Sequence, residues 1–152
     1  MVGAAISGTI GIQGHCANGL AALFIACGQD AACVAEAAIG NTAFLLREGG
    51  KLQVSVTLPN LIVGTVGGGT ALPSQRSCLE ILGMSGEGKA RAFAKVAAAL
   101  CLAGEMSITG ALAAGEFCAG ACAPRPRQRR LMTVKDSCSR WRHIWFDRTG
   151  VV

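Results

Sequence analysis

Three consecutive glycines, Gly67, Gly68 and Gly69, are the most chemically suggestive feature of this 152-residue sequence. They follow an apolar run and precede Pro73, a residue that favours the start of a helix. Because glycine has no β-carbon, such a turn can bring backbone N–H groups against a phosphate or carbonyl oxygen. A tight turn that binds nothing is the alternative interpretation of the same pattern.

Three polar side chains upstream are further candidates. Asp30 carries a carboxylate that can take part in proton transfer, but it can equally cap the N–H groups of Ala32 and Cys33 at the start of a short helix. His15 and Asn18 place an imidazole and an amide on one apolar helical pattern. A lone histidine on a glycine-rich helix is also typical of a purely structural residue.

Two stretches resemble a known family. Residues 64–75, Gly-Thr-Val-Gly-Gly-Gly-Thr-Ala-Leu-Pro-Ser-Gln, resemble the signature of 3-hydroxy-3-methylglutaryl-coenzyme A reductase. Residues 25–30, Ile-Ala-Cys-Gly-Gln-Asp, resemble a second motif at the expected distance upstream. The resemblance covers residues 2–117 and implies an α+β fold, the C-terminal part of the family's large catalytic domain, with a long central helix and short strands.

The same resemblance implies a reaction and roles for residues. The reaction is a two-step, four-electron reduction of a thioester by two NADPH molecules, which yields mevalonate and coenzyme A. Asp30 matches the catalytic aspartate, which favours the charged form of a neighbouring lysine and helps keep a glutamate protonated. His15 and Asn18 lie in Gln-Gly-His-Cys-Ala-Asn, which resembles the family's Asn-Ala-His-Ala-x-Asn stretch beside the substrate. The residues expected beside NADPH are Val66, Gly67, Gly68, Gly69 and Thr70.

Other parts of the family's catalytic machinery have no match here. The motifs with the catalytic glutamate and lysine precede the region of resemblance, and the position of the C-terminal histidine, counted from Phe117, is Ala121. We therefore expect a fragment that is inactive alone. The alternative is a non-catalytic binding or dimerisation module with the same fold. A complete protein is expected to bind hydroxymethylglutaryl-CoA and NADPH as a homo-oligomer, because the family forms its sites across dimer interfaces.

Charge divides the chain into two regions. Residues 1–122 carry six Lys/Arg and seven Asp/Glu, whereas residues 123–152 carry eight basic and two acidic residues. We interpret residues 1–117 as the partial catalytic domain and residues 118–152 as a basic, disordered tail. There are two alternatives to a disordered tail. The tail could bind nucleic acid, or translation could have left the family's reading frame after Phe117. We expect no nucleic-acid partner. Cys118 and Cys122 lack a second Cys/His pair, so no metal site is expected.

Cysteine usage and hydropathy indicate a compartment. Several of the eight cysteines, including Cys27, Cys78 and Cys101, lie in apolar helical runs, and the first basic residue is Arg47. Reduced thiols, no secretory signal and a cytoplasmic location are the expectation. Residues 1–29 contain no Asp, Glu, Lys or Arg, but glycines and polar residues interrupt them, so no membrane span is expected.

Periodicity predicts the elements that must position these side chains. Helices are expected over residues 15–27, from Asp30 onward, over 73–82 and over 87–116, the last with a possible kink near Gly104 or Gly110. Strict alternation predicts a strand over 51–58, and a second short strand is expected at 61–63. Residues 3–12 are expected to form a short strand or loop.

Overall fold

The computed structural model describes residues 13–116, which belong to the first of the two units into which the chain divides, Met1–Phe117. The expected strand or loop at 3–12 and the expected tail at 118–152 lie outside the described residues. Four helices, one two-stranded antiparallel sheet and two 3-10 turns make up the described part, so the α+β class is confirmed. The placement of this part within a larger catalytic domain stays a prediction.

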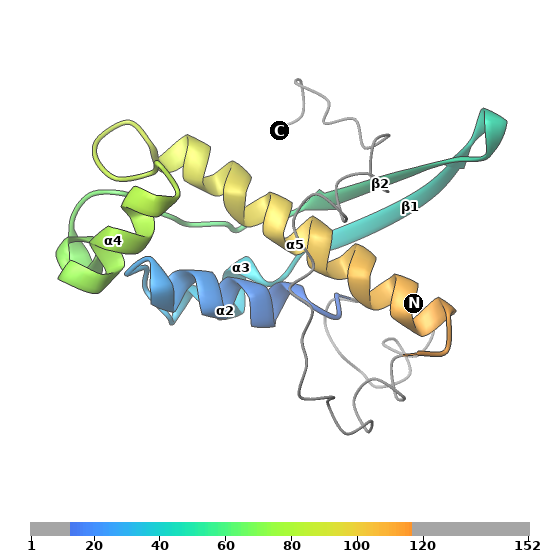
Figure 1. Cartoon of the computed structure of the whole chain (residues 1–152), viewed down its shortest axis with the longest axis horizontal. Helices are drawn as coiled ribbons and strands as arrows, with labels where there is room; N and C mark the ends of the chain where they lie inside the picture. The colour runs from blue at the N-terminus through green and yellow to red at the C-terminus, as the bar shows by residue number, and fades with distance from the viewer. Residues whose placement is uncertain (1–12, 117–152) are drawn as a thin grey trace, which may run out of the picture. The chain divides into compact units, whose positions relative to one another are not determined.

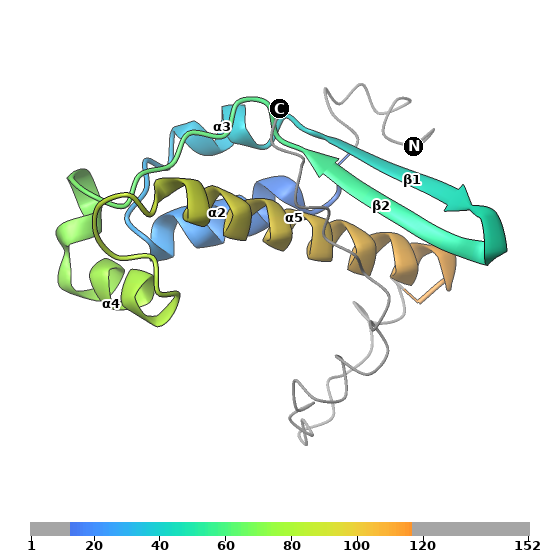
Figure 2. The same cartoon turned by 90° about the horizontal axis from the view of Figure 1, so that it is seen from above.

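Two helices form the centre of the fold. Helix α2 (Cys16–Ala26) packs against the long helix α5 (Ala90–Ala113) (Figures 1 and 2). Their small and apolar side chains form one buried cluster together with Ala37 of α3, and further residues from α3 and β2 pack around it. The fully buried members of that cluster are Cys16, Leu20, Phe24, Ala37, Ala97 and Cys101.

Helix α5 confirms the long helix predicted from the apolar stripe. It runs through Gly104 and Gly110 as one α-helix. By length and composition it is the one helix within residues 13–116 that could cross a membrane, with a mean hydropathy of 1.6 over its most apolar window. It also packs against α2 and β2, and its buried residues are Phe93, Ala97, Cys101 and Glu105.

The sheet is a single hairpin. Strand β1 (Asn41–Arg47) pairs with β2 (Lys51–Thr57) in antiparallel register, from Asn41 opposite Thr57 to Arg47 opposite Lys51. The 3-10 turn η1 (Glu48–Gly50) joins them. Figure 1 shows the hairpin diverging from the C-terminal half of α5, so that the turn between its strands lies away from the helices. The predicted strand at 51–58 is thereby confirmed to within one residue.

The prediction of a second strand at 61–63 is wrong. Residues 61–63 belong to an extended segment without ladder hydrogen bonds, because the hairpin's two strands pair only with each other. Leu61 and Val63 nevertheless pack against the buried clusters, whereas Ile62 is exposed. The alternation of side chains is therefore real, but it records packing beside α2 rather than membership of a sheet.

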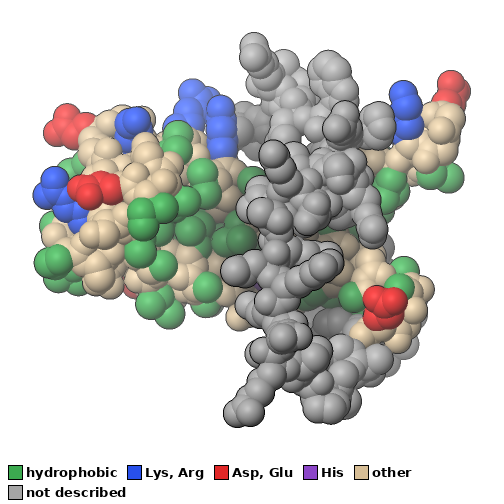
Figure 3. All heavy atoms as spheres, in the orientation of Figure 1, with side chains coloured by type: hydrophobic (Ala, Val, Ile, Leu, Met, Phe, Trp, Pro, Cys, Tyr) green, Lys and Arg blue, Asp and Glu red, His purple; other side chains and the backbone are tan. Residues whose placement is uncertain are grey.

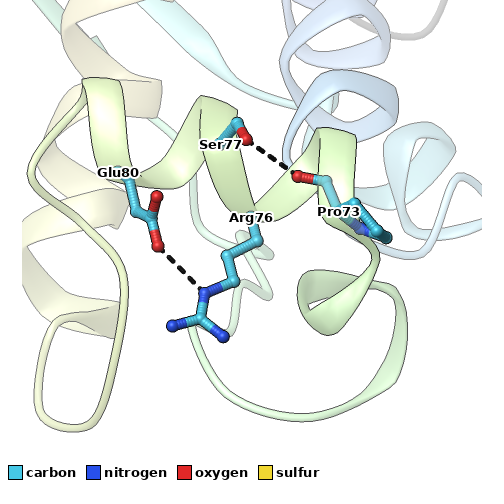
Figure 4. A network of polar contacts seen from close by, with 4 residues as sticks. All are labelled: Pro73, Arg76, Ser77 and Glu80. Atoms are coloured by element: carbon cyan, nitrogen blue, oxygen red, sulfur yellow. Dashed lines mark hydrogen bonds and ion pairs between the residues drawn. The ribbon is translucent and has the colours of Figure 1, made fainter.

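Two shorter helices complete the unit. Helix α3 (Cys33–Ala37) packs against α2, and α4 (Pro73–Ile81) begins with the proline that the sequence places there. On the exposed side of α4, the Arg76 guanidinium pairs with the Glu80 carboxylate at 2.9 Å (Figure 4). The Ser77 hydroxyl in the same view donates to the Pro73 carbonyl at 2.9 Å. The predicted helix at 73–82 is confirmed.

A second buried cluster ties α4 to the ends of α2 and α5. Cys27, Leu79 and Phe93 are its buried members. The five cysteines within the described residues are all free. Burial raises the pKa of the Cys27 thiol, so this side chain behaves as a small apolar group.

Candidate functional site

The C-terminal end of α2 delivers Asp30. Gly28 has φ +67°, and the Gln29 N–H donates to the Phe24 carbonyl at 2.9 Å, the closing bond of a Schellman turn. The Asp30 carboxylate then accepts from the Ala32 N–H at 2.9 Å, while the Cys33 N–H donates to the Asp30 backbone carbonyl at 3.1 Å. The predicted hydrogen bond to the Ala32 N–H is therefore present, but the carboxylate does not bind the Cys33 N–H, and α3 begins at Cys33 rather than at Asp30.

The glycine turn is stabilised by a hydrogen bond from its own threonine. Gly67 and Gly68 have φ of +84° and +55°, and a 3-10 turn, η2 (Gly68–Ala71), follows. Thr70 is buried, and its hydroxyl donates to the Gly67 carbonyl at 2.6 Å. Within residues 13–116, the N–H groups of Gly67, Gly68 and Gly69 donate to no backbone or side-chain acceptor. The turn therefore presents backbone donors to solvent.

The two motifs touch each other. Gly69 lies so close to Gly28 that a β-carbon on either would overlap the other's backbone. The Gln29 side chain accepts from the Gly64 N–H at 2.8 Å and donates to the Cys27 carbonyl at 3.0 Å. This side chain thus links the end of α2 to the entry of the glycine turn. Motif matching alone gave Gln29 no such role, although its place beside Asp30 was a usable signal.

An open pocket of about 530 Å³ lies where the motifs meet. Asp30 lines it together with Val66, Gly67, Gly68, Gly69 and Thr70, so the structure brings the predicted catalytic aspartate and the predicted cofactor residues into one site. Cys33 lines it as well, and desolvation, reinforced by the nearby Asp30 carboxylate, raises the pKa of the Cys33 thiol. Among the described residues, Asp30 and Cys33 are the only ionisable side chains on the pocket wall.

His15 and Asn18 lie apart from this pocket. Both belong to the N-terminal end of α2, whereas Asp30 follows its C-terminal end. The His15 imidazole packs against Gly104 of α5 and Gly19 of its own helix, and Asn18 is exposed. The two predicted substrate residues therefore share one end of α2, separated by the length of the helix from the other predicted site residues.

One buried carboxylate escaped the sequence analysis. Glu105 is 4% exposed in the middle of α5. Its Oε1 accepts from the N–H of His15 at 2.6 Å and of Cys16 at 3.1 Å, and its Oε2 accepts from the N–H of Gly14 at 3.1 Å. An acidic residue within the apolar face of a predicted core helix was the signal that could have found it.

Comparison with known proteins identifies the family of the chain. The family model for hydroxymethylglutaryl-coenzyme A reductase matches residues 1–121. The 3-hydroxy-3-methylglutaryl-coenzyme A reductase of Methanocaldococcus jannaschii is 48% identical over 116 residues, which cover 76% of this chain and 28% of the relative. The Aeropyrum pernix enzyme of the same name is 47% identical over 122 residues, 77% of this chain and 29% of the relative.

The match extends to eukaryotes. The protein of the same name from Fusarium fujikuroi is 44% identical over 125 residues, which cover 77% of this chain and 13% of the relative. The chain thus spans less than a third of the length of each of these relatives. On the extent of the family match, and with both motifs meeting in one pocket, the chain belongs to the hydroxymethylglutaryl-coenzyme A reductase family.

Proposed function

We propose that residues 13–116 supply part of the site at which hydroxymethylglutaryl-CoA is reduced by NADPH. The observation that carries the proposal is the shared pocket, which Asp30 and the glycine turn at 66–70 both line. Unpaired backbone N–H groups suit the phosphate oxygens of a dinucleotide, and a flanking carboxylate suits proton transfer. In this proposal Asp30 acts in catalysis, the turn lines the cofactor, and His15 and Asn18 contact the substrate.

We further propose that the chain binds cofactor without turning substrate over. Reduction of a thioester builds negative charge on the carbonyl oxygen, and a cation or strong donor must stabilise that charge. Among the described residues, no lysine, arginine or histidine lines the pocket. A cationic group from elsewhere in a complete family site has to complete the chemistry.

Titration of the purified chain with NADPH tests the proposal. Gly68→Ala places a methyl group in the turn at φ +55°, and Gly83→Ala is the matched control at φ +69° outside the pocket. Saturable NADPH binding, weakened about tenfold or more by Gly68→Ala and within about twofold of wild type in Gly83→Ala, is expected. Equal NADPH affinity of the wild type, Gly68→Ala and Gly83→Ala would refute a role for the glycine turn in cofactor binding.

A non-catalytic module is the second candidate, and exposed apolar side chains favour it. Hydrophobic groups remain on the described surface (green in Figure 3). Ile25, Ile62, Val66 and Leu72 around the pocket are each more than half exposed. Adding the purified upstream part of a family catalytic domain separates the two candidates, because restored NADPH oxidation supports a catalytic fragment and stable association without oxidation supports a module.

A further inference from the structure

The N-terminus of α2 is capped from another helix. The first N–H groups of an α-helix have no partner within it, and a local side chain usually accepts from them. The N-cap residue of α2, His15, makes no side-chain cap hydrogen bond. Glu105, 90 residues further along the chain, accepts from Gly14, His15 and Cys16 instead. The cap is therefore a tertiary contact between α2 and α5.

The choice of a carboxylate at this position needs a reason beyond packing. Glu105 is 4% exposed, and within residues 13–116 the single ion pair joins other residues, Arg76 and Glu80. Burying a charge without a cation costs free energy, so an apolar side chain would fill the space more cheaply. A carboxylate, however, offers two oxygens that accept from three N–H groups and donate to none. The positive end of the α2 dipole adds to this attraction.

Residues 14–16 also pack against the neighbours of Glu105 on α5. A β-carbon at Gly104 would overlap the His15 ring, so ring and backbone of residue 15 both rest on consecutive residues of α5. A β-carbon at Gly14 would lie 3.2 Å from the Ile108 side chain, one turn further along. Residues 14–16 are thereby fixed in position along α5 as well as in distance from it.

We propose that Glu105 is a positioning residue for the substrate end of the site. By holding the backbone of residues 14–16, it keeps His15 and Asn18 in one orientation relative to α5. This inference rests on the proposed function in one respect, the assignment of His15 and Asn18 to the substrate. The cap itself is independent of that assignment and can be tested without any ligand.

Amide hydrogen exchange on Glu105→Gln tests the cap. Glutamine keeps the shape but replaces one acceptor oxygen with an NH₂ group that faces N–H donors. The Gly14, His15 and Cys16 amides should exchange about 10- to 100-fold faster, while the Cys27 and Gln29 amides at the other end of α2 stay within roughly twofold. Glu48→Gln, in the exposed hairpin turn, is the matched control and should change neither group. Unchanged exchange, or equal acceleration at both ends, would overturn the cap.

Comparing the effect of Glu105→Gln on the affinities for two ligands tests the positioning role. Glu105→Gln should weaken hydroxymethylglutaryl-CoA binding about tenfold and leave NADPH binding within about twofold, because the glycine turn lies at the other end of α2. Equal loss of both ligands would show a merely structural role and overturn the proposal. If Glu105→Gln does not fold, the same two affinities are measured on Glu105→Asp. This variant keeps both oxygens on a shorter side chain. A wild-type chain that binds neither ligand would refute the proposed function, and hydrogen exchange would still decide on the cap.

Discussion

A β-carbon at Gly28 would overlap the carbonyl group of Gly69. The turn that ends α2 and the glycine turn therefore meet backbone against backbone, 41 residues apart in the chain. The Gln29–Gly64 hydrogen bond of 2.8 Å supports the same junction. Because Asp30 comes two residues after Gly28, this contact helps to bring Asp30 and the glycine turn to the wall of one pocket.

Gly28→Ala should destabilise the unit far more than a matched glycine substitution. Gly28 and Gly83 have nearly equal φ, +67° and +69°, but a β-carbon at Gly83 meets nothing within 4 Å. Both variants carry left-handed backbone strain, and only Gly28→Ala adds a backbone overlap. We expect a loss of about 2–5 kcal/mol in the free energy of unfolding for Gly28→Ala and about 1–2 kcal/mol for Gly83→Ala, measured by urea denaturation. Equal losses would contradict the close approach.

Asp30→Asn should separate chemistry from capping. Asparagine caps a helix about as well as aspartate, and its side-chain oxygen can still accept from the Ala32 N–H. In a full-length reductase that contains this segment, we expect NADPH oxidation to be abolished. The free energy of unfolding, measured by thermal denaturation, should change by less than about 0.5 kcal/mol. Asp30→Ala, which also loses the cap, should cost about 1 kcal/mol. Near-normal turnover in Asp30→Asn would refute a catalytic role for this carboxylate.

Gly104→Ala should reveal the packing of the His15 ring. Alanine normally stabilises a helix interior by about 0.5–1 kcal/mol relative to glycine, and Gly110→Ala, whose β-carbon would meet nothing, should show that gain. Gly104→Ala should instead lose about 1–3 kcal/mol because its methyl group overlaps the imidazole. In the double variant with His15→Ala most of that loss should disappear, a coupling of about 1–2 kcal/mol in a double-mutant cycle. A stabilising Gly104→Ala would disprove the contact.

Alkaline pH should destabilise the unit through its buried thiols. Burial raises the pKa of Cys16, Cys27 and Cys101 above the ordinary 9.0. Above about pH 9 the unfolded chain releases these protons while the folded chain retains them. The stabilising effect is therefore complete below this pH and is lost as the pH rises toward the folded-state pKa values.

Each such thiol should contribute up to about 1.4 kcal/mol per pH unit to this loss. The chain has no tyrosine whose titration would overlap. Urea denaturation between pH 8 and pH 10.5 measures the slope. Cys101→Ala should flatten it by one thiol's share, whatever its effect on stability at neutral pH. An unchanged slope in Cys101→Ala would contradict the burial argument.

Local signals in the sequence determined several elements. Gly28 and Gly83 end helices at left-handed φ, Pro73 begins α4, and the apolar stripe from Phe93 onward forms α5. The residues of both site motifs were also identifiable, because their type and spacing are local properties of the chain. The family resemblance assigned Asp30 to catalysis and the glycine turn to the cofactor, whereas the pocket that both of them line is a feature of the tertiary structure.

Contacts between distant residues were decided only by the tertiary structure. The alternation of side chains at 61–63 predicted a strand, but whether another strand pairs with residues 61–63 depends on distant residues, and none does so within the described residues. The pairing of β1 with β2 likewise depends on the turn between them. The cap on α2 was invisible in its own sequence, since the acceptor, Glu105, lies on α5. A short window of sequence records the preference of a backbone for helix or strand, whereas a buried hydrogen bond depends on which segments folding brings together.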